Sequence, residues 1–279
     1  MANVLRRLTY FPQLTNLARR AGVAPALRSL YYRWATPRGV LKLQVSDVCL
    51  SLYARNPEEV RDLEGASMSN DCAWSERHTL ETCLAFLAPG DIVYDVGANY
   101  GLYSVALGKR VGEQGQIIAF EPLRRNFERL QANIQLNDLK NIRCFPYALG
   151  EQADRTEMYV EEERPWRSTL LKGPPSSRQA HAAEVVEVVE GDWFRRTQSL
   201  PVPRAVKIDV EGFEYSVMRG LRQMLAEARC EFLVCEVHPQ LLPAGTAVED
   251  ILGLLRSCGF NGIDSHARGP ELHIFCYKR

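Results

Sequence analysis

The sequence predicts an α/β fold built on a seven-stranded, mostly parallel sheet that carries a C-terminal antiparallel strand. From residue 91 onward, short apolar segments alternate with helical patterns of about ten to fifteen residues, which is typical of consecutive βαβ units. The letters H-A-R-G-P join the last two strands as a hairpin, which requires one antiparallel strand. A chain of 279 residues suits one large domain of this kind with an appendage.

Each element is predicted from its own local pattern. Strands are short apolar runs, and helices bring apolar residues to one face every three to four positions. A capping-type Ser75 begins the first helix of the domain, and Pro89 with Gly90 ends it. The predicted strands are 91–96, 116–121, 141–146, 204–210, 231–238, 261–266 and 271–277. The predicted helices are 75–88, 101–111, 123–137, 214–227 and 247–258.

Residues 1–74 are expected to form a basic N-terminal extension, helical with a short β element, before a catalytic domain at 75–279. The first 46 residues contain seven arginines and Lys42 but no Asp or Glu. Apolar residues between Val4 and Leu17 recur at helical spacing and predict an amphipathic basic helix. This helix either covers the acidic remainder of the chain or a dimer partner, or it touches anionic lipid, a phosphorylated or lipid-linked substrate, or nucleic acid.

Composition places the chain among ordinary soluble enzymes. Hydrophobic residues make up 46% and charged residues 24%, and no apolar run reaches the roughly 18 residues of a membrane span. The eight cysteines are scattered without a CxxC pair, which indicates free thiols in a reducing compartment. No signal peptide is evident, so a cytoplasmic location is expected, although an Arg-rich start also resembles a transit peptide.

The segment 161–182 interrupts the βαβ pattern. It is rich in Pro, Ser and charge, yet it contains Trp166 and the pair Leu170 and Leu171. Long loops within compact domains are commonly functional or disordered, so we predict either a loop that folds over a substrate or a mobile excursion. Its flanks, T-E-M-Y-V and A-E-V-V-E-V-V, are predicted to pair as extra strands.

The strongest chemical signal is I-V-Y-D-V-G-A-N-Y-G-L-Y-S, a strand that leads through Gly97 and Gly101 into a helix. Glycines let a ligand lie against the backbone, and the helix start presents unpaired N–H groups. Asp95 would repel a pyrophosphate but suits a ligand that carries an α-ammonium and a sulfonium. Asn99 and Tyr100 are expected near the amino-acid moiety or the ribose, and Asn99 is alternatively a plain turn residue.

Two further strands are predicted to end in acids at the same edge of the sheet. Q-I-I-A-F-E-P ends in Glu121, where a carboxylate can accept hydrogen bonds from both ribose hydroxyls. In R-A-V-K-I-D-V-E-G-F-E, strand alternation puts Lys207, Asp209 and Glu211 on one face. Lys207 with Asp209 is alternatively a structural ion pair, and Glu214 fits a helix N-terminal acid.

The segment E-F-L-V-C-E-V-H-P places Glu236 and His238 last on one strand face. His238 is the first candidate for the general base, followed by Glu211 and Asp209. The alternative is a histidine that is hydrogen-bonded to Glu236 and merely holds the rim together. Asp209, Glu211, Glu236 and His238 could also coordinate a divalent cation, but no spacing requires one, so we assign no metal.

Five motifs together resemble the FkbM-type methyltransferases: D-V-G-A-N-Y-G-L-Y-S, F-E-P-L-R-R-N-F-E-R-L-Q-A-N, Y-A-L-G, K-I-D-V-E-G-F-E and C-E-V-H-P. The resemblance spans about residues 75–278 and implies a class I, Rossmann-like methyltransferase fold with S-adenosylmethionine as donor. It places Glu121 on the ribose and Ala148 with Leu149 in a loop that flanks the adenine. It also makes Asp95, Gly97, Asn99 and Gly101 the cofactor loop, and Asp209 with Glu211 the acidic motif after the fourth strand.

The resemblance implies O-methylation of a hydroxyl on a sugar, polyketide or other secondary metabolite, by in-line displacement with general-base assistance. The expected partner is a small hydroxylated acceptor, including a lipid-linked glycan. No nucleic acid is expected, and peripheral membrane contact or a homodimer stays open. A fold-retaining non-catalytic scaffold is the main alternative. A nucleotide-dependent oxidoreductase is a weaker one, because the chain lacks G-x-G-x-x-G before this helix.

Overall fold

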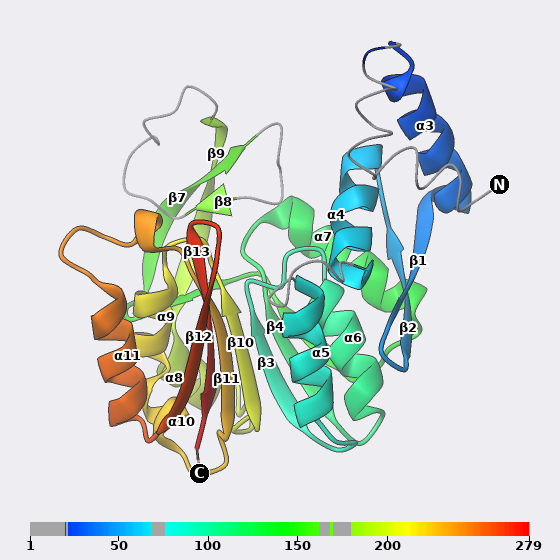
Figure 1. Cartoon of the computed structure of the whole chain (residues 1–279). Helices are drawn as coiled ribbons and strands as arrows, with labels where there is room; N and C mark the ends of the chain where they lie inside the picture. Colours follow the sequence, from blue (N-terminus) through cyan, green and yellow to red (C-terminus); the bar gives the residue numbers. More distant parts are fainter. Residues whose placement is uncertain (1–19, 21, 69–75, 162–167, 170–179, 279) are drawn as a thin grey trace. The chain divides into compact units, whose positions relative to one another are not determined.

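The computed structural model describes residues 20, 22–68, 76–161, 168–169 and 180–278, and the chain divides into two compact units, Met1–Glu81 and Thr82–Arg279 (Figure 1). The predicted basic helix between Val4 and Leu17 lies outside the described residues, as does most of the segment 161–182. No helix within the described ranges has the length and apolar character needed to cross a membrane.

The N-terminal unit contains the β element that the sequence predicts. Its elements are α3 (Ala24–Ala35), η1 (Pro37–Gly39), β1 (Val40–Val45), β2 (Val48–Tyr53) and α4 (Pro57–Met68). The two strands form an antiparallel hairpin in which Leu41, Leu43 and Val45 are buried, because alternate side chains of a strand point to one face. Tyr31 of α3 donates a hydrogen bond to the buried Glu64 of α4, at 2.5 Å.

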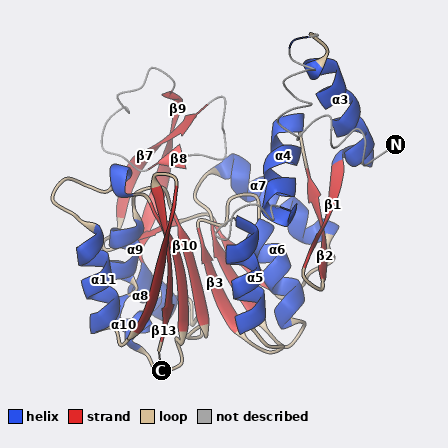
Figure 2. Ribbon diagram, viewed as in Figure 1, coloured by secondary structure: helices blue, strands red, loops and turns tan. Residues whose placement is uncertain are grey.

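The larger unit is built on a seven-stranded sheet whose strands match the predicted ranges. In chain order they are β3 (Ile92–Val96), β4 (Gln116–Phe120), β5 (Ile142–Phe145), β10 (Ala205–Asp209), β11 (Phe232–Val237), β12 (Gly262–Arg268) and β13 (Glu271–Tyr277). Their spatial order is β12-β13-β11-β10-β3-β4-β5, and β13 runs antiparallel to the other six strands (Figure 2). This confirms the predicted class I methyltransferase fold.

Helices cover both faces of this sheet (Figures 1 and 2). One face carries α6 (Leu102–Val111) and α7 (Arg124–Leu136), and the other carries α8 (Gly191–Thr197), α9 (Glu214–Gly220), α10 (Arg222–Ala226) and α11 (Val248–Ser257). The boundary between the two compact units falls within α5 (Glu76–Phe86). With helices on both sides, the central strands bury both faces, which explains their nearly continuous apolar sequences.

Two helical predictions need correction. The single helix expected at 214–227 is broken into α9 and α10 at Leu221, and the break follows Gly220, where a Cβ would lie 1.8 Å from the carbonyl oxygen of Gly150. Helix α8 was not predicted, although its signals are local. The side chain of Glu190 accepts the N–H of Trp193 and caps the helix.

The flanks of segment 161–182 pair as predicted and extend into a second sheet. It contains β6 (Ala148–Gly150), β7 (Asp154–Glu161), β8 (Ser168–Thr169) and β9 (Ala180–Glu190), in the order β6-β9-β7-β8. Strands β7 and β9 are antiparallel, and β6 pairs in parallel with the end of β9. The expected loop at Ala148 and Leu149 is therefore a strand, because its backbone groups pair with Val188 and its neighbours.

The chain order of the strands reverses between β3 and β10, which are direct neighbours in the sheet. From β3 the chain proceeds through β4 to β5 on one side, and from β10 to β11 on the other. Ligands of open α/β sheets bind beyond the carboxyl ends of the strands at such a reversal. The two motifs that the sequence singled out, at the ends of β3 and β10, therefore meet at this point.

Candidate active site

The turn between β3 and α6 depends on glycine at the closest approach of two chain segments. Gly97 has φ +77°, and a Cβ there would lie 1.9 Å from the carbonyl oxygen of Asp209. Its N–H donates to the carbonyl of Phe120 on β4, at 3.0 Å. Asn99 and Gly101 also have positive φ, at 51° and 92°. The turn is therefore fitted closely against the ends of both neighbouring strands.

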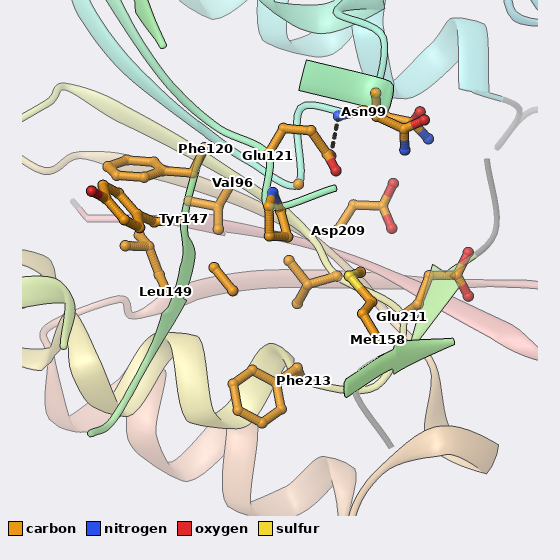
Figure 3. A pocket seen from close by; sticks show the side chains of 15 residues that line it. Val96, Asn99, Phe120, Glu121, Tyr147, Leu149, Met158, Asp209, Glu211 and Phe213 are labelled. Atoms are coloured by element: carbon orange, nitrogen blue, oxygen red, sulfur yellow. Dashed lines mark hydrogen bonds between the residues drawn. The ribbon is translucent and has the colours of Figure 1, made fainter. Parts of the chain in front are cut away.

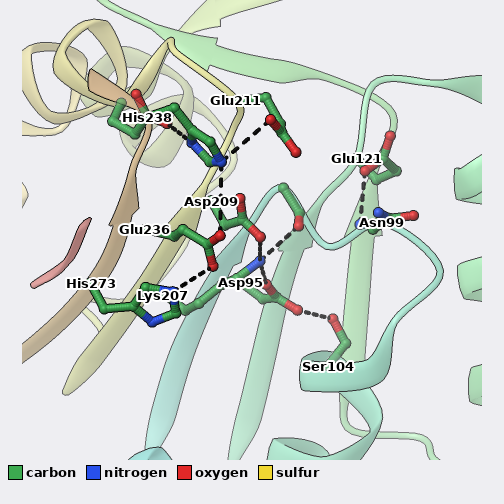
Figure 4. Close-up of polar contacts among 12 residues, drawn as sticks. Asp95, Asn99, Ser104, Glu121, Lys207, Asp209, Glu211, Glu236, His238 and His273 are labelled. Carbon is green, nitrogen blue, oxygen red and sulfur yellow. Dashed lines mark hydrogen bonds and ion pairs between the residues drawn. The ribbon is translucent and has the colours of Figure 1, made fainter. Parts of the chain in front are cut away.

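Asp95 lies behind this turn instead of in the ligand cavity. Its side chain is fully buried, accepts a hydrogen bond from Ser104 at 2.6 Å, and lies 3.3 Å from the ammonium of Lys207 (Figure 4). The same ammonium donates to the carbonyl of Gly97 at 2.8 Å. The contact of Asp95 with the cofactor stays a prediction; in the structure its charge is balanced by Lys207, and Asp95 is not among the residues that line the pocket.

Glu121 holds the outer part of the same turn. One carboxylate oxygen accepts the backbone N–H of Asn99 at 2.8 Å, and the other accepts that of Leu123 at 3.0 Å. Burial raises the pKa of Glu121 to about 7, although hydrogen bonds from Leu123, Asn99 and Asn126 and the charge of Lys207 act in the opposite direction. The side chain borders the pocket, where the predicted ribose contact is geometrically available.

One pocket lies over the strand-order reversal, with about 560 Å³ of empty space that includes space open to solvent. Figure 3 shows Phe120, Tyr147 and Leu149 on one side and Asp209 with Glu211 on the opposite side. The lining residues are Val96, Gly97, Asn99, Phe120, Glu121, Pro122, Asn126, Tyr147, Ala148, Leu149, Met158, Asp209, Val210, Glu211 and Phe213. The pocket thus joins an apolar half to a carboxylate-bearing half.

Asp209 and Glu211 reach the pocket from the end of β10 and the turn after it. Glu211 has φ 50°, and Gly212 follows with φ +100° and with Leu241 packed against its α-carbon. A non-glycine residue in the left-handed region is uncommon and is held there only by surrounding structure. The side chains of Asp209 and Glu211 are 33% and 21% exposed, so both carboxylates are open to a ligand.

His238 is enclosed by acidic side chains and does not line the pocket. Its Nδ1 lies 2.7 Å from Glu214, its Nε2 lies 3.3 Å from Glu211, and Glu236 is 3.8 Å away. Burial alone lowers the pKa of His238, but the hydrogen bond to Glu214 and the charges of Glu211, Asp209 and Glu214 raise it to about 9. A raised pKa makes an imidazole a weaker proton acceptor, and the choice of the base among His238, Glu211 and Asp209 stays a prediction.

Of the remaining predicted site residues, some border the pocket and others do not. Ala148 borders the pocket from β6, as expected for an adenine-flanking position, whereas Tyr100 and Gly101 do not border it. The carbonyl of Tyr100 accepts a hydrogen bond from Asn133, and Arg129 lies over its ring. These two residues of the turn therefore hold it to α7.

Several lining residues were not singled out from the sequence. Asn126 and Tyr147 lie inside the motifs F-E-P-L-R-R-N and Y-A-L-G, so a local signal existed for both. Phe213 follows the acidic motif directly. Met158 comes from β7 and lies in the pocket wall only because the second sheet returns to the end of β10, which no local pattern indicates.

Comparison with known proteins gives consistent matches. The family model described as the methyltransferase FkbM domain matches residues 95–261, more than half of the chain. The chain is 24% identical over 221 residues to the hexuronic acid methyltransferase AglP of Haloferax volcanii, which covers 78% of this chain and 80% of that relative. It is 25% identical over 144 residues to Methyltransferase 1 of Beauveria bassiana, which covers 46% of this chain and 57% of that relative.

Among solved structures, fibrillarin of Aeropyrum pernix with natively bound S-adenosyl-L-methionine aligns with a TM-score of 0.43 at 14% identity, over 68% of this chain and 67% of that chain. The domain match begins at Asp95 near the end of β3 and extends past His238. It therefore includes every pocket-lining residue described above. The chain belongs to the FkbM methyltransferase family and is an S-adenosylmethionine-dependent methyltransferase.

Proposed function

We propose that this enzyme transfers the methyl group of S-adenosylmethionine to a hydroxyl of a small acceptor, a sugar, a polyketide or another secondary metabolite. The carrying observation is the two-sided pocket, in which aromatic and aliphatic side chains face the carboxylates of Asp209 and Glu211. The apolar side chains suit the adenosine of the donor. The carboxylates suit its sulfonium and α-ammonium, because opposite charges attract in a site of low dielectric.

In this proposal the adenine lies beside Tyr147 and Leu149, and Glu121 accepts hydrogen bonds from the ribose hydroxyls. The methionine part then extends over Gly97 toward Asp209. We propose that Asp209 and Glu211, which line the pocket, select a positively charged donor over a diphosphate, a role that the sequence predicted for Asp95. A nucleotide diphosphate would meet the same carboxylates and be repelled.

The acceptor hydroxyl attacks the methyl carbon in line with the sulfur. The new O–C bond forms as the S–C bond breaks with its electron pair on sulfur, and the hydroxyl proton passes to Asp209 or Glu211. Alignment of the reacting atoms at about 3–3.5 Å supplies much of the rate. Base assistance adds about 10²–10⁴-fold. A sugar acceptor is supported by the hexuronic acid methyltransferase among the relatives.

The test combines calorimetry with a turnover assay. Calorimetry of the full chain should detect S-adenosylmethionine and S-adenosylhomocysteine but not NAD or ATP. Incubation with hydroxylated acceptors, including neutral sugars, hexuronic acids and polyketide alcohols, should release S-adenosylhomocysteine together with an acceptor heavier by one methylene. Cofactor binding without turnover on any acceptor class would favour the scaffold alternative, and tight NAD or ATP binding without S-adenosylmethionine binding would overturn the proposal.

A further inference from the structure

The histidine beside the pocket has the orientation of a metal ligand. His238 is 1% exposed, and its Nδ1 lies 2.7 Å from an oxygen of Glu214, which also accepts the N–H of Gly212. Histidines that bind metals usually donate the other ring N–H to a carboxylate, which fixes the tautomer and turns the free nitrogen toward the ion. Here that arrangement directs Nε2 toward Glu211, at 3.3 Å, and toward Glu236 (Figure 4).

Three ligand atoms already converge at this position. One carboxylate oxygen of Asp209, one of Glu211 and a ring nitrogen of His238 all lie within 4.8 Å of one another. Ligands held about 2.0–2.2 Å from one ion are about 3 Å apart when adjacent and at most about 4.4 Å apart when opposite. The observed separations need only small side-chain adjustments to surround a cation.

The charges at this position also favour a cation. Four carboxylates surround the imidazole, those of Asp209, Glu211, Glu214 and Glu236. Lys207 lies 3.8 Å from Asp209, but it is closer to Asp95, at 3.3 Å. A dication between Asp209 and Glu211 would reduce the repulsion among these carboxylates.

We propose that Asp209, Glu211 and His238 bind a divalent cation such as Mg²⁺ or Mn²⁺ at the edge of the donor pocket, with Glu214 as the positioning residue for His238. The oxygen-rich ligand set suits these ions. The cation would bind Nε2 of His238 in place of a proton, while Nδ1 keeps its hydrogen bond to Glu214. This site departs from the expectation from sequence that no metal is used, because the sequence could not show that the three side chains converge.

The role of the cation rests on the proposed methyl transfer. A hydroxyl oxygen bound to the cation loses its proton more readily, because the positive charge stabilises the developing alkoxide. Each carboxylate ligand uses one oxygen for the cation, so the second oxygen of Asp209 or Glu211 still receives the proton. The alkoxide oxygen takes the methyl carbon, the S–C electron pair returns to sulfur, and the charge of the cation is unchanged.

A neighbouring cluster provides an internal comparison. Oxygens of Glu236 and Glu271 and a nitrogen of His273 also lie within 4.8 Å of one another. None of these three residues borders the pocket, and Glu236 already contacts His273 at 3.1 Å and Arg268 at 3.8 Å. Because Asp209 and Glu211 do border the pocket, we assign the site to the first cluster.

Binding is tested with Mn²⁺ alone on the full, chelator-treated chain, by electron paramagnetic resonance of the free ion. One Mn²⁺ per chain is expected. Asp209→Asn, at a partly exposed position, and His238→Gln should each weaken binding at least tenfold, and Glu214→Gln should weaken it about 10–100-fold through His238. The matched control Glu271→Gln should leave binding unchanged. Failure of Mn²⁺ to bind, or loss of binding in Glu271→Gln but not in Asp209→Asn, overturns the proposal.

A turnover assay separates this inference from the proposed function. The chelated enzyme should lose at least tenfold in rate and recover on addition of Mn²⁺ or Mg²⁺, and it should still bind S-adenosylmethionine. Full turnover without any divalent cation would overturn the metal site and leave the methyl transfer standing. Mn²⁺ binding without transfer to any acceptor would support the site and count against the proposed reaction.

Discussion

Lys207 on β10 holds its ammonium 3.3 Å from the carboxylate of Asp95 on the adjacent strand β3, and both side chains are shielded from solvent. The two residues are direct partners in the parallel ladder. Because the ammonium also donates to the carbonyl of Gly97, this ion pair joins the two strands to the glycine turn at the point where the strand order reverses. The ion pair therefore stabilises the glycine turn that lines the pocket over this reversal.

Lys207→Met should destabilise the protein by about 3–5 kcal/mol, because removal of one partner leaves a buried charge without compensation. Asp95 would lose the ammonium that balances its charge and keep the hydrogen bond from Ser104. Urea unfolding followed by circular dichroism measures the change. The double variant Asp95→Asn/Lys207→Met removes both charges and should recover part of the loss, and an equal loss in both variants would show that the charge of Asp95 is not the cause.

Gly97→Ala should cost more stability than Gly90→Ala and should also weaken S-adenosylmethionine binding. Both glycines have positive φ, at 77° and 90°, so backbone strain of about 1–2 kcal/mol is common to both substitutions. Only Gly97 faces a backbone oxygen, that of Asp209, at 1.9 Å from the added carbon, whereas nothing lies within 4 Å at Gly90. Urea unfolding and calorimetry measure the two effects, and equal losses in the two variants would contradict the close approach.

Binding of S-adenosylmethionine should weaken as the pH falls below 7, because burial raises the pKa of Glu121 to about 7 and only the ionised carboxylate can accept from both ribose hydroxyls. Calorimetry between about pH 8 and pH 6 should show a loss of roughly tenfold, as the ionised fraction falls. Glu121→Gln should bind more weakly and lose this pH dependence. A pH dependence that persists in Glu121→Gln would assign it to another group.

The same raised pKa affects the stability of the free enzyme. The folded state holds the proton of Glu121 up to about pH 7, whereas the ordinary value is 4.5. The stabilising contribution is fully present below 4.5 and is lost as the pH rises through the folded value. Thermal unfolding should therefore show that this contribution declines from about pH 4.5 to 7 in the parent and is absent in Glu121→Gln.

Substitution of the pocket carboxylates should reduce turnover more than it reduces donor binding. Asp209→Asn and Glu211→Gln should each lower kcat by about 10²–10⁴-fold if the carboxylate receives the acceptor proton. His238→Ala should also lower kcat with little change in donor affinity, since His238 contacts Glu211 and does not border the pocket. Steady-state kinetics with calorimetry separates the two quantities, and unchanged kcat in both carboxylate variants would remove them from the proton transfer.

Local sequence patterns were sufficient for most of the fold. The apolar runs of β3 and β10 and the helical periodicity of α7 and α11 each lie within one stretch of chain. Helix 214–227 was predicted as continuous, but it breaks at Leu221, next to the close approach of Gly220 to the carbonyl of Gly150, a residue distant in sequence. A contact between residues so far apart in sequence is not visible in the apolar periodicity of 214–227.

For the site, sequence determined which chemical groups gather at the carboxyl ends of the strands. Chain connectivity brings Gly97, Glu121 and Asp209 to one edge, since parallel strands all end there. These residues border the pocket, as their positions in the motifs led us to expect.

Only the tertiary structure decided which charged side chains contact one another. Lys207 reaches across the ladder to Asp95, and this ion pair balances the charge of Asp95 behind the turn. Glu214 and Glu211 raise the pKa of His238 to about 9 against the effect of burial, a shift that the sequence around His238 does not predict. Ionisation depends on distances of a few ångströms between side chains far apart in the chain, and such distances exist only after folding.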